Sequence, residues 1–424
     1  MIITIITFII VFGILVVVHE FGHFIVAKKS GIMVREFSIG MGPKIFYHRF
    51  NGTTYTLRML PIGGYVRMAG SADDEDEEIQ PGTPVTLKVS NHNQVSSINL
   101  SKKQTLFQGI PVIVTDSDLE RELWIKGYQN GDESSVKKYS VDHDATIVES
   151  DGTEVQIAPL DVQFQSAPLW KRILTNFAGI FNNVLLAVIT FMILSFVQGG
   201  VSTNSNQVNP LPKSSAARNA GIKSNDRITN VNGTKTDNWN QLQVAIQKHP
   251  NQKIKLAVNH NGSQKNVTLK TDSTKANGKK VGVIGVKNVL DHSFTAKLMS
   301  GITQTWSMTV LLVGFLFRMI MGHFSLNDLG GPVAIFATTS QATKLGLSGV
   351  LYFLGFLSIN LAIVNLVPIP ALDGGKILLN IIEGIRRKPL SEKVEMIITF
   401  IGFAFILVLM VLVTWNDIER YFLH

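Results

Sequence analysis

The sequence of 424 residues contains no cysteine, and charged residues make up only 17% of it. Without cysteine the chain cannot hold a disulfide framework, an iron–sulfur cluster or a cysteine-ligated zinc site, and it has no thiol nucleophile. Soluble proteins average about 25% charged residues, so this low charge and the 45% of apolar residues favour a membrane protein. Because the chain has no cysteine, any metal must be bound by nitrogen and oxygen ligands.

The formal net charge is +8. Nucleic-acid binding is one explanation, but basic residues in membrane proteins also gather at the cytoplasmic ends of spans. Several basic residues of this chain stand at the ends of apolar stretches: Lys28, Lys29, Lys171, Arg172, Arg386, Arg387 and Lys388. We interpret the charge as topological and expect no nucleic-acid partner.

Charge-free stretches long enough to be considered as membrane spans cover residues 1–18, 173–197, 298–317, 345–372 and 396–416. The first has neither the basic start nor the cleavage site of a signal peptide, and we interpret it as a retained helix. The third is rich in serine and threonine. We expect it to be interfacial or re-entrant, so that four helices cross the bilayer.

A polar region separates the first two stretches. Residues 28–70 alternate apolar and polar side chains between turn-forming glycines, with Asn51-Gly52 as the sharpest turn signal, which predicts β-hairpins. Residues 71–170 begin with the acidic run 73–78 and are rich in Ser, Asn, Gln and Asp. We interpret this second part as a solvated, loop-like cytoplasmic insertion of uncertain fold, with a partner-binding tail as the alternative.

Residues 199–290 resemble a PDZ domain. The resemblance rests on Ala220-Gly221-Ile222, Asp226-Arg227-Ile228 and the Asn232-Gly233 turn. A helix-like stretch, 239–248, and an alternating strand, 253–258, follow these motifs. PDZ domains bind extended peptides by adding a strand to a sheet edge, so the resemblance implies a peptide ligand.

The run His19-Glu20-Phe21-Gly22-His23 is an HExxH motif. On a helix, residues i and i+4 share a face, so His19 and His23 can bind one zinc ion while Glu20 acts as a general base toward water. These polar groups are costly to bury in an apolar helix unless they face one another, a cavity or a metal. The alternative is two unrelated histidines at a helix end.

Catalytic zinc sites usually have three protein ligands and one open position. The best candidate for the third ligand is Asp373, which follows the longest charge-free stretch. Pro368 and Pro370 must break or kink a helix there, and broken backbone at membrane depth is tolerated only inside protein or beside a wet cavity. The alternative is a carboxylate that only marks the end of the membrane span. The HExxH motif favours the metal-ligand interpretation over this alternative.

Together these motifs resemble the site-2 proteases, which are zinc intramembrane proteases, and in particular their bacterial branch with a PDZ domain. The resemblance is carried by the HExxH motif at 19–23, Gly63-Gly64-Tyr65-Val66, and the stretch from Asn365 to Gly374 that reads NLVPIPALDG. It implies that His19, His23 and Asp373 bind Zn²⁺. It also implies that Glu20 activates the water.

The resemblance further implies a β-loop, with Gly63, Gly64 and Tyr65, that holds an unwound substrate as an added strand. A simple tight turn at Gly63-Gly64 is the alternative. Asn360 and Asn365 are expected beside the substrate or the oxyanion, with hydrogen bonds between helices as the alternative.

Asn183 is also a candidate substrate-binding residue by this resemblance. The family commonly has a Gly-Pro-x-x-Asn pattern in the second span, and here Gly179 and Asn183 match it. Ile180 stands in place of the proline, which weakens the assignment of Asn183.

The membrane topology gives a test of whether Asp373 and the HExxH motif can share one metal ion. If Asp373 and the HExxH motif bind one ion, both must lie at similar depth, and their segments must cross in the same direction. Basic residues at the span ends then place the active site toward the cytoplasmic side and the PDZ-like region outside. A fifth full crossing would move Asp373 to the wrong side.

The predicted fold class is a polytopic α-helical membrane protein with four transmembrane helices, a membrane-associated β-hairpin region and an extracytoplasmic PDZ-like α/β domain. In chain order we expect a transmembrane helix with HExxH (1–27), the hairpin region (28–70), the insertion (71–170), a second transmembrane helix (171–198), the PDZ-like domain (199–290), the interfacial or re-entrant segment (291–344), a third transmembrane helix with NxxPxPxLDG (345–376), a cytoplasmic loop (377–395), a fourth transmembrane helix (396–416) and a tail (417–424).

The predicted function is that of a zinc-dependent intramembrane endopeptidase in the cell membrane. By resemblance, its partners are single-span membrane proteins such as anti-sigma factors or remnant signal peptides, together with the lipid bilayer. The first alternative is a divalent-metal or proton transporter that uses His19, His23 and Asp373 as a transport site. The second is a silent membrane receptor that uses only the PDZ-like groove.

Overall fold

The computed structural model describes residues 1–70, 79–101, 108–150, 152–210, 215–276, 279–322, 324–388 and 390–423. The chain divides into two compact units. Unit 1 comprises Met1–Thr190 and Gln304–His424, and unit 2 comprises Phe191–Thr303. The acidic run 73–78 lies outside the described residues.

Within the described ranges, five helices are long and apolar enough to cross a membrane. They are α1 (Ile2–Ser30), α2 (Leu169–Val197), α5 (Phe294–Ile320), α7 (Gly346–Leu366) and α9 (Glu392–Ile418). The least apolar is α5, which nevertheless forms one uninterrupted helix of 27 residues. The expectation of four crossings stays a prediction.

The expected helix break at Pro368 and Pro370 is present. Helix α7 ends at Leu366, and α8 (Asp373–Arg386) begins at Asp373. Residues 377–386 are therefore helical, and the loop predicted for 377–395 begins too early. The apolar residues Leu378, Ile381 and Ile385 repeat with helical spacing, so the basic residues that follow them mark the end of this helix.

A shorter helix, α6 (Pro332–Lys344), packs against α1, α7 and α9 within unit 1. Buried Val11 and Leu15 of α1 share a hydrophobic cluster with Ala342 of α6 and with Phe353 and Leu354 of α7. This cluster fixes the helix that carries the HExxH motif.

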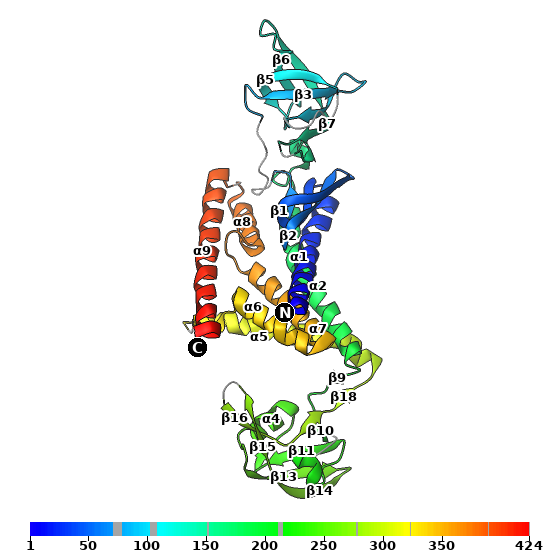
Figure 1. Cartoon of the computed structure of the whole chain (residues 1–424), viewed down its shortest axis with the longest axis vertical. Helices are drawn as coiled ribbons and strands as arrows, with labels where there is room; N and C mark the ends of the chain where they lie inside the picture. The colour runs from blue at the N-terminus through cyan, green and yellow to red at the C-terminus, as the bar shows by residue number, and fades with distance from the viewer. Residues whose placement is uncertain are drawn as a thin grey trace. The chain divides into compact units, whose positions relative to one another are not determined.

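The predicted hairpin is formed by β1 (Val34–Phe50) and β2 (Thr53–Met68), which lie along α1 (Figure 1). Asn51 and Gly52 have φ angles of 50° and 75°, as the favoured two-residue hairpin turn requires. Both strands bend, so the ladder contains four segments in the order 44–50, 53–58, 34–39 and 64–68. In this sheet, segment 64–68 has a partner strand on one side only.

The part of the insertion that follows the acidic run is a folded β-domain. Its strands are β3 (Pro84–Val89), β4 (Val95–Asn99), β5 (Ile110–Asp118), β6 (Trp124–Gln129), β7 (Val136–Val148) and β8 (Glu154–Gln156). They follow the order β4-β3-β5-β6-β7-β8, and an additional parallel pairing of β4 with β7 closes the sheet into a small barrel. We call the described residues within 79–157 (79–101, 108–150 and 152–157) the barrel.

The interpretation of this region as a solvated loop is therefore wrong for the described residues. Leu87, Val95, Ile98, Val114 and Ile125 are completely buried in the barrel's core. The strands are short and their outward side chains are polar, so the overall composition resembles that of a loop although alternate residues are apolar.

Unit 2 contains a β-sheet in the order β14-β13-β11-β10-β17, with β12 (Thr234–Lys235) paired to β11. The remaining elements are β9 (Val201–Ser202), β10 (Gln207–Pro210), α3 (Ala216–Asn219), β11 (Asp226–Val231), α4 (Trp239–Gln247), β13 (Lys253–His260), β14 (Ser263–Lys270), β15 (Asp272–Ala276), β16 (Lys279–Val283), β17 (Val286–Asn288) and β18 (Leu290–Asp291). The expected small helix, strand, Asn-Gly turn and longer helix occur in that order. The PDZ assignment itself stays a prediction.

Replacement of the barrel residue Leu87 tests whether residues 79–157 form an independent core. Leu87 is 0% exposed, so Leu87→Ala leaves a cavity and should destabilise the barrel by about 2–5 kcal/mol. Hydrogen exchange of the full-length protein in detergent should show faster exchange in the barrel strands and unchanged exchange in α1. Val136→Ala, at a side chain 52% exposed, is the control, and equal exchange in the two variants would refute this core.

Candidate metal centre

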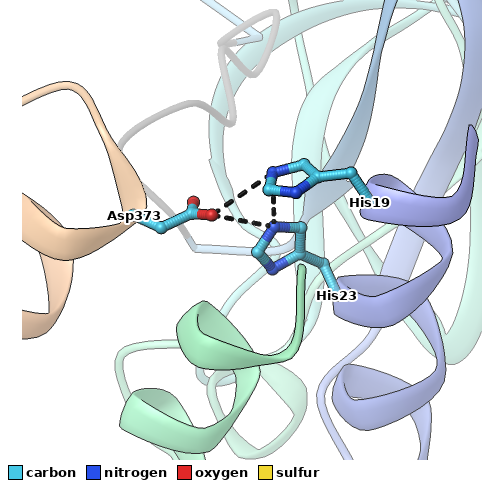
Figure 2. A group of neighbouring side chains, drawn as sticks. All are labelled: His19, His23 and Asp373. Carbon is cyan, nitrogen blue, oxygen red and sulfur yellow. Dashed lines mark hydrogen bonds and ion pairs between the residues drawn. The ribbon is translucent and has the colours of Figure 1, made fainter. Parts of the chain in front are cut away.

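Three predicted ligand residues from distant parts of the chain meet at one point. His19 and His23 project from one face of α1, and Asp373, the first residue of α8, points toward them (Figure 2). The two imidazole Nε2 atoms are 3.3 Å apart, and each lies 3.3 Å from Asp373 Oδ2. The three atoms therefore form an equilateral triangle.

This triangle fits a tetrahedral zinc site. Ligand atoms about 2.0–2.1 Å from zinc at tetrahedral angles lie roughly 3.3–3.4 Å apart. Asp373 Oδ2 is buried and makes no hydrogen bond, which leaves its lone pairs available for a cation. Two imidazoles and one carboxylate are a usual donor set for catalytic zinc, so the residues fit the ion.

Helix α2 lies behind both imidazoles and holds them from the far side. His23 Nδ1 donates to the carbonyl oxygen of Thr175 at 2.8 Å, and Asn183 Nδ2 lies 3.0 Å from His19 Nδ1. Such contacts fix ring orientation in metal sites. Asn183 is fully buried against His19 and is not among the lining residues of the cavity. Its expected role in substrate binding stays a prediction.

Gly179 of α2 leaves space for the two rings. A Cβ at this position would lie 2.2 Å from His23 Nε2 and 2.8 Å from His19 Cε1. Helix α2 can therefore lie this close to the imidazoles only because residue 179 is a glycine.

The triangle opens on a cavity of about 460 Å³. Its lining residues are His19, Glu20, His23, Tyr65, Val66, Arg67, Met68, Asn176, Asp373 and Lys376. The cavity thus joins the HExxH motif, the start of α8 and segment 64–68 of the hairpin. Glu20 and Tyr65, both predicted site residues, line this cavity.

Tyr65 is held by a network of hydrogen bonds in the hairpin. Arg58 Nη2 donates to Tyr65 Oη at 2.6 Å and to Glu36 Oε1 at 2.8 Å. Burial and the Glu36 carboxylate raise the pKa of Tyr65 to about 12. The phenol therefore stays protonated and neutral in the cavity wall at neutral pH.

The motifs did not identify Arg67 and Lys376 as cavity residues. Arg67 Nη1 forms an ion pair with Glu149 Oε1 of the barrel's β7–β8 connection at 2.9 Å, so the barrel contacts the cavity wall. Lys376 follows Asp373 by three residues, and this helical spacing was the signal that could have found it. Arg67 had no such signal.

The remaining candidates, Gly63, Gly64, Asn360 and Asn365, are not among the lining residues of the cavity. Gly63 has a φ of 84°, and a Cβ at Gly64 would lie 2.7 Å from the Ser38 carbonyl oxygen, so both positions need glycine. Asn360 and Asn365 are half-buried on α7. Asn360 Nδ2 donates to the carbonyl oxygen of Phe356 within the same helix at 3.2 Å, which is neither the predicted substrate contact nor the alternative of a hydrogen bond between helices.

Comparison with known proteins decides the family. The family model of peptidase family M50 matches residues 7–409. The chain belongs to peptidase family M50. A protein of Enterococcus faecalis named as a probable protease, eep, is 53% identical to it over 421 residues, which cover 99% of each chain. Proteins named as zinc metalloproteases in Lactococcus lactis and Streptococcus pneumoniae are 48% and 47% identical and match this M50 peptidase over at least 99% of each chain.

The resemblance to the site-2 proteases is thereby confirmed. This M50 peptidase is a zinc metalloendopeptidase and a multi-pass membrane protein. Family membership favours the protease prediction over the transporter and receptor alternatives.

Substitution of Gly179 tests whether α2 sets the metal centre of this M50 peptidase. Gly179→Ala should push His23 out of the triangle and reduce bound zinc well below the wild-type level, as measured by atomic absorption on purified protein. Gly13→Ala is the control, because no atom lies within 4 Å of a Cβ at that position of α1. Full zinc retention by Gly179→Ala would contradict the geometry.

Proposed function

We propose that this M50 peptidase hydrolyses peptide bonds within or near the membrane segments of single-span proteins. The proposal is carried by one observation, the 3.3 Å triangle of two Nε2 atoms and Asp373 Oδ2 at the same cavity as Glu20. His19, His23 and Asp373 hold Zn²⁺, which supplies Lewis acidity for polarising a carbonyl and activating water when bound.

Glu20 is assigned the proton transfers. Its carboxylate accepts a proton from the attacking water and then gives that proton to the leaving amine nitrogen. Glu20 lies between the two histidines in the sequence of α1, and its side chain lines the cavity that they share. One residue can therefore serve as base and then as acid.

Asn183 is assigned the orientation of His19. In the structure its Nδ2 faces His19 Nδ1, and its Oδ1 is buried without a hydrogen bond. Rotation of the amide by 180° turns Oδ1 toward His19, so that Nδ1–H donates to it and Nε2 keeps its lone pair for the ion. Thr175 O plays the same part for His23 by accepting from Nδ1.

Segment 64–68 of β2 is assigned the binding of the scissile segment. Among the described strands it pairs on one side only, and Tyr65, Val66, Arg67 and Met68 line the cavity. A Cβ at Gly64 would lie 3.6 Å from Glu20 Cγ, so this strand passes beside the general base. A substrate unwound into a strand could pair with this edge, which would compensate its backbone polar groups.

Asn360 and Asn365 are proposed to contact the substrate from α7. Both residues are half-buried, so each keeps some accessible surface. An amide in an apolar helix is costly unless it is paired, and substrate backbone would supply such a partner.

The proposed topology follows from the basic residues at the span ends, which place the active site toward the cytoplasm and unit 2 outside the cell membrane. Unit 2 is proposed to be a PDZ-like domain, because its helices, strands and Asn232-Gly233 turn follow the order expected from the sequence. It would either exclude substrates with large outer domains or bind their new termini. The proposed substrates are anti-sigma factors and remnant signal peptides.

The deciding experiment is cleavage of a single-span model substrate by the purified full-length protein in liposomes. Wild type should cleave it, and Glu20→Gln should reduce the rate by about 10²–10⁴-fold because the proton acceptor is lost. Both proteins should retain about one zinc ion per chain, since Glu20 is not one of the three ligands. Zinc content and product mass spectra are the measurements.

Other outcomes would overturn parts of the proposal. Equal cleavage by Glu20→Gln would remove Glu20 from the mechanism. Zinc binding with no cleavage, together with metal flux across the liposome membrane, would favour the transporter.

A further inference from the structure

The turn between α7 and α8 has a strained backbone. Ile369 N donates to the Val367 carbonyl oxygen at 2.7 Å, and Leu372 N donates to the Ile369 carbonyl oxygen at 3.0 Å. Ala371 has a φ of 86°, a conformation that L residues other than glycine rarely adopt. Such strain costs on the order of 1–3 kcal/mol and persists only where the surroundings hold it. It lies two residues before Asp373.

One face of this turn is held by α9 at Gly402. A Cβ at Gly402 would lie 1.8 Å from the Pro370 carbonyl oxygen and 2.5 Å from the carbonyl carbon. Both are backbone atoms, so they cannot move aside as a flexible side chain can. Any side chain at position 402 must therefore displace either α9 or the turn.

On its other side the turn packs closely against the first turn of α8. A Cβ at Gly375 would lie 2.3 Å from the Ile369 carbonyl oxygen, and one at Gly374 would lie 2.4 Å from the Leu366 carbonyl oxygen. The first turn of α8 is thus packed directly against the segment that precedes it. A displacement of Pro370 must pass along this short segment to Asp373.

The contact at Gly402 is unusual for its helix. Only 11% of the apolar window of α9 is buried, the lowest share among the five candidate spans of the described chain. Gly402 is nevertheless buried. This mostly exposed helix therefore makes a very close backbone contact with the turn that precedes Asp373.

We propose that Gly402 is a positioning residue for the metal centre, because it lets α9 lie against Pro370 and so fixes the strained turn that sets the place of Asp373. This inference rests on the proposed role of Asp373 as a ligand. Metal–ligand distances in proteins lie within about 0.2 Å of their standard values, so a small shift of the turn is enough to weaken binding.

The test compares Gly402→Ala with Gly314→Ala in the full-length protein. Gly314 is an exposed glycine of α5, and no atom lies within 4 Å of a Cβ there. Gly402→Ala should lower zinc affinity about 10–100-fold, the usual effect of losing an outer contact of a metal site, as measured by competition with a chelator. The visible spectrum of the Co²⁺-substituted protein should also change. Gly314→Ala should match wild type in both measurements.

Thermal unfolding of the metal-free variants, with Leu87→Ala as a second control, separates positioning from general packing. Metal-free Gly402→Ala is expected to unfold at a lower temperature than wild type, because the added Cβ must displace α9 or the turn. Leu87→Ala lowers stability in the barrel, away from the metal centre, and should keep the wild-type zinc affinity and cobalt spectrum. Wild-type zinc affinity and an unchanged cobalt spectrum in Gly402→Ala would overturn the proposal. A loss of zinc affinity in Leu87→Ala like that in Gly402→Ala would overturn it too, since the effect would then be one of general stability.

Asp373→Asn distinguishes failure of this inference from failure of the proposed site. If Asp373→Asn keeps wild-type zinc affinity, the ligand assignment itself is wrong, and the role of Gly402 is overturned with it. If Asp373→Asn loses zinc and Gly402→Ala does not, the site stands and only the positioning role fails.

Discussion

Two imidazoles and a carboxylate must share one buried point between apolar helices, and the architecture of unit 1 depends on this constraint. Polar groups without partners are costly in such surroundings. His19, His23 and Asp373 avoid that cost by facing one another at 3.3 Å. Because one helix supplies two of them and a distant segment supplies the third, α1 and α8 have to be held in fixed relation.

Close backbone approaches provide that fixed relation. A Cβ at Gly22 of α1 would lie 2.4 Å from the Ala178 carbonyl oxygen, and Gly179 and Gly402 allow equally close contacts with the histidines and the turn. Membrane helices lack a strong hydrophobic drive to associate and use small residues to approach one another. The positions of the three ligands therefore depend on these glycines, which allow close backbone contacts, as much as on the ligand residues themselves.

Local patterns in the sequence predicted much of this arrangement. The spacing of His19 and His23 placed both rings on one helical face, Pro368 and Pro370 predicted the break, and Asn51-Gly52 predicted the hairpin turn. Each of these signals depends on residues that are close in the sequence, so helix and turn geometry is enough to interpret it.

Features that depend on distant contacts could not be predicted in the same way. The barrel was missed because its core residues are single apolar positions within polar strands, and its closure by β4 and β7 joins segments about 50 residues apart. The pairing of Arg67 with Glu149 and the approach of Gly402 to Pro370 likewise leave no local pattern. Only the folded chain reveals which residues these are.

The barrel enters and leaves the rest of unit 1 at nearly one place. Phe164 N donates to the Ala69 carbonyl oxygen at 2.7 Å, and Met33 N donates to the Val162 carbonyl oxygen at 2.9 Å. Segments inserted at adjacent points disturb their host least. Evolution could therefore have added, exchanged or removed this domain as a module without rebuilding the strands around the cavity, while the ion pair at Arg67 gave such a module a direct mechanical link to the site.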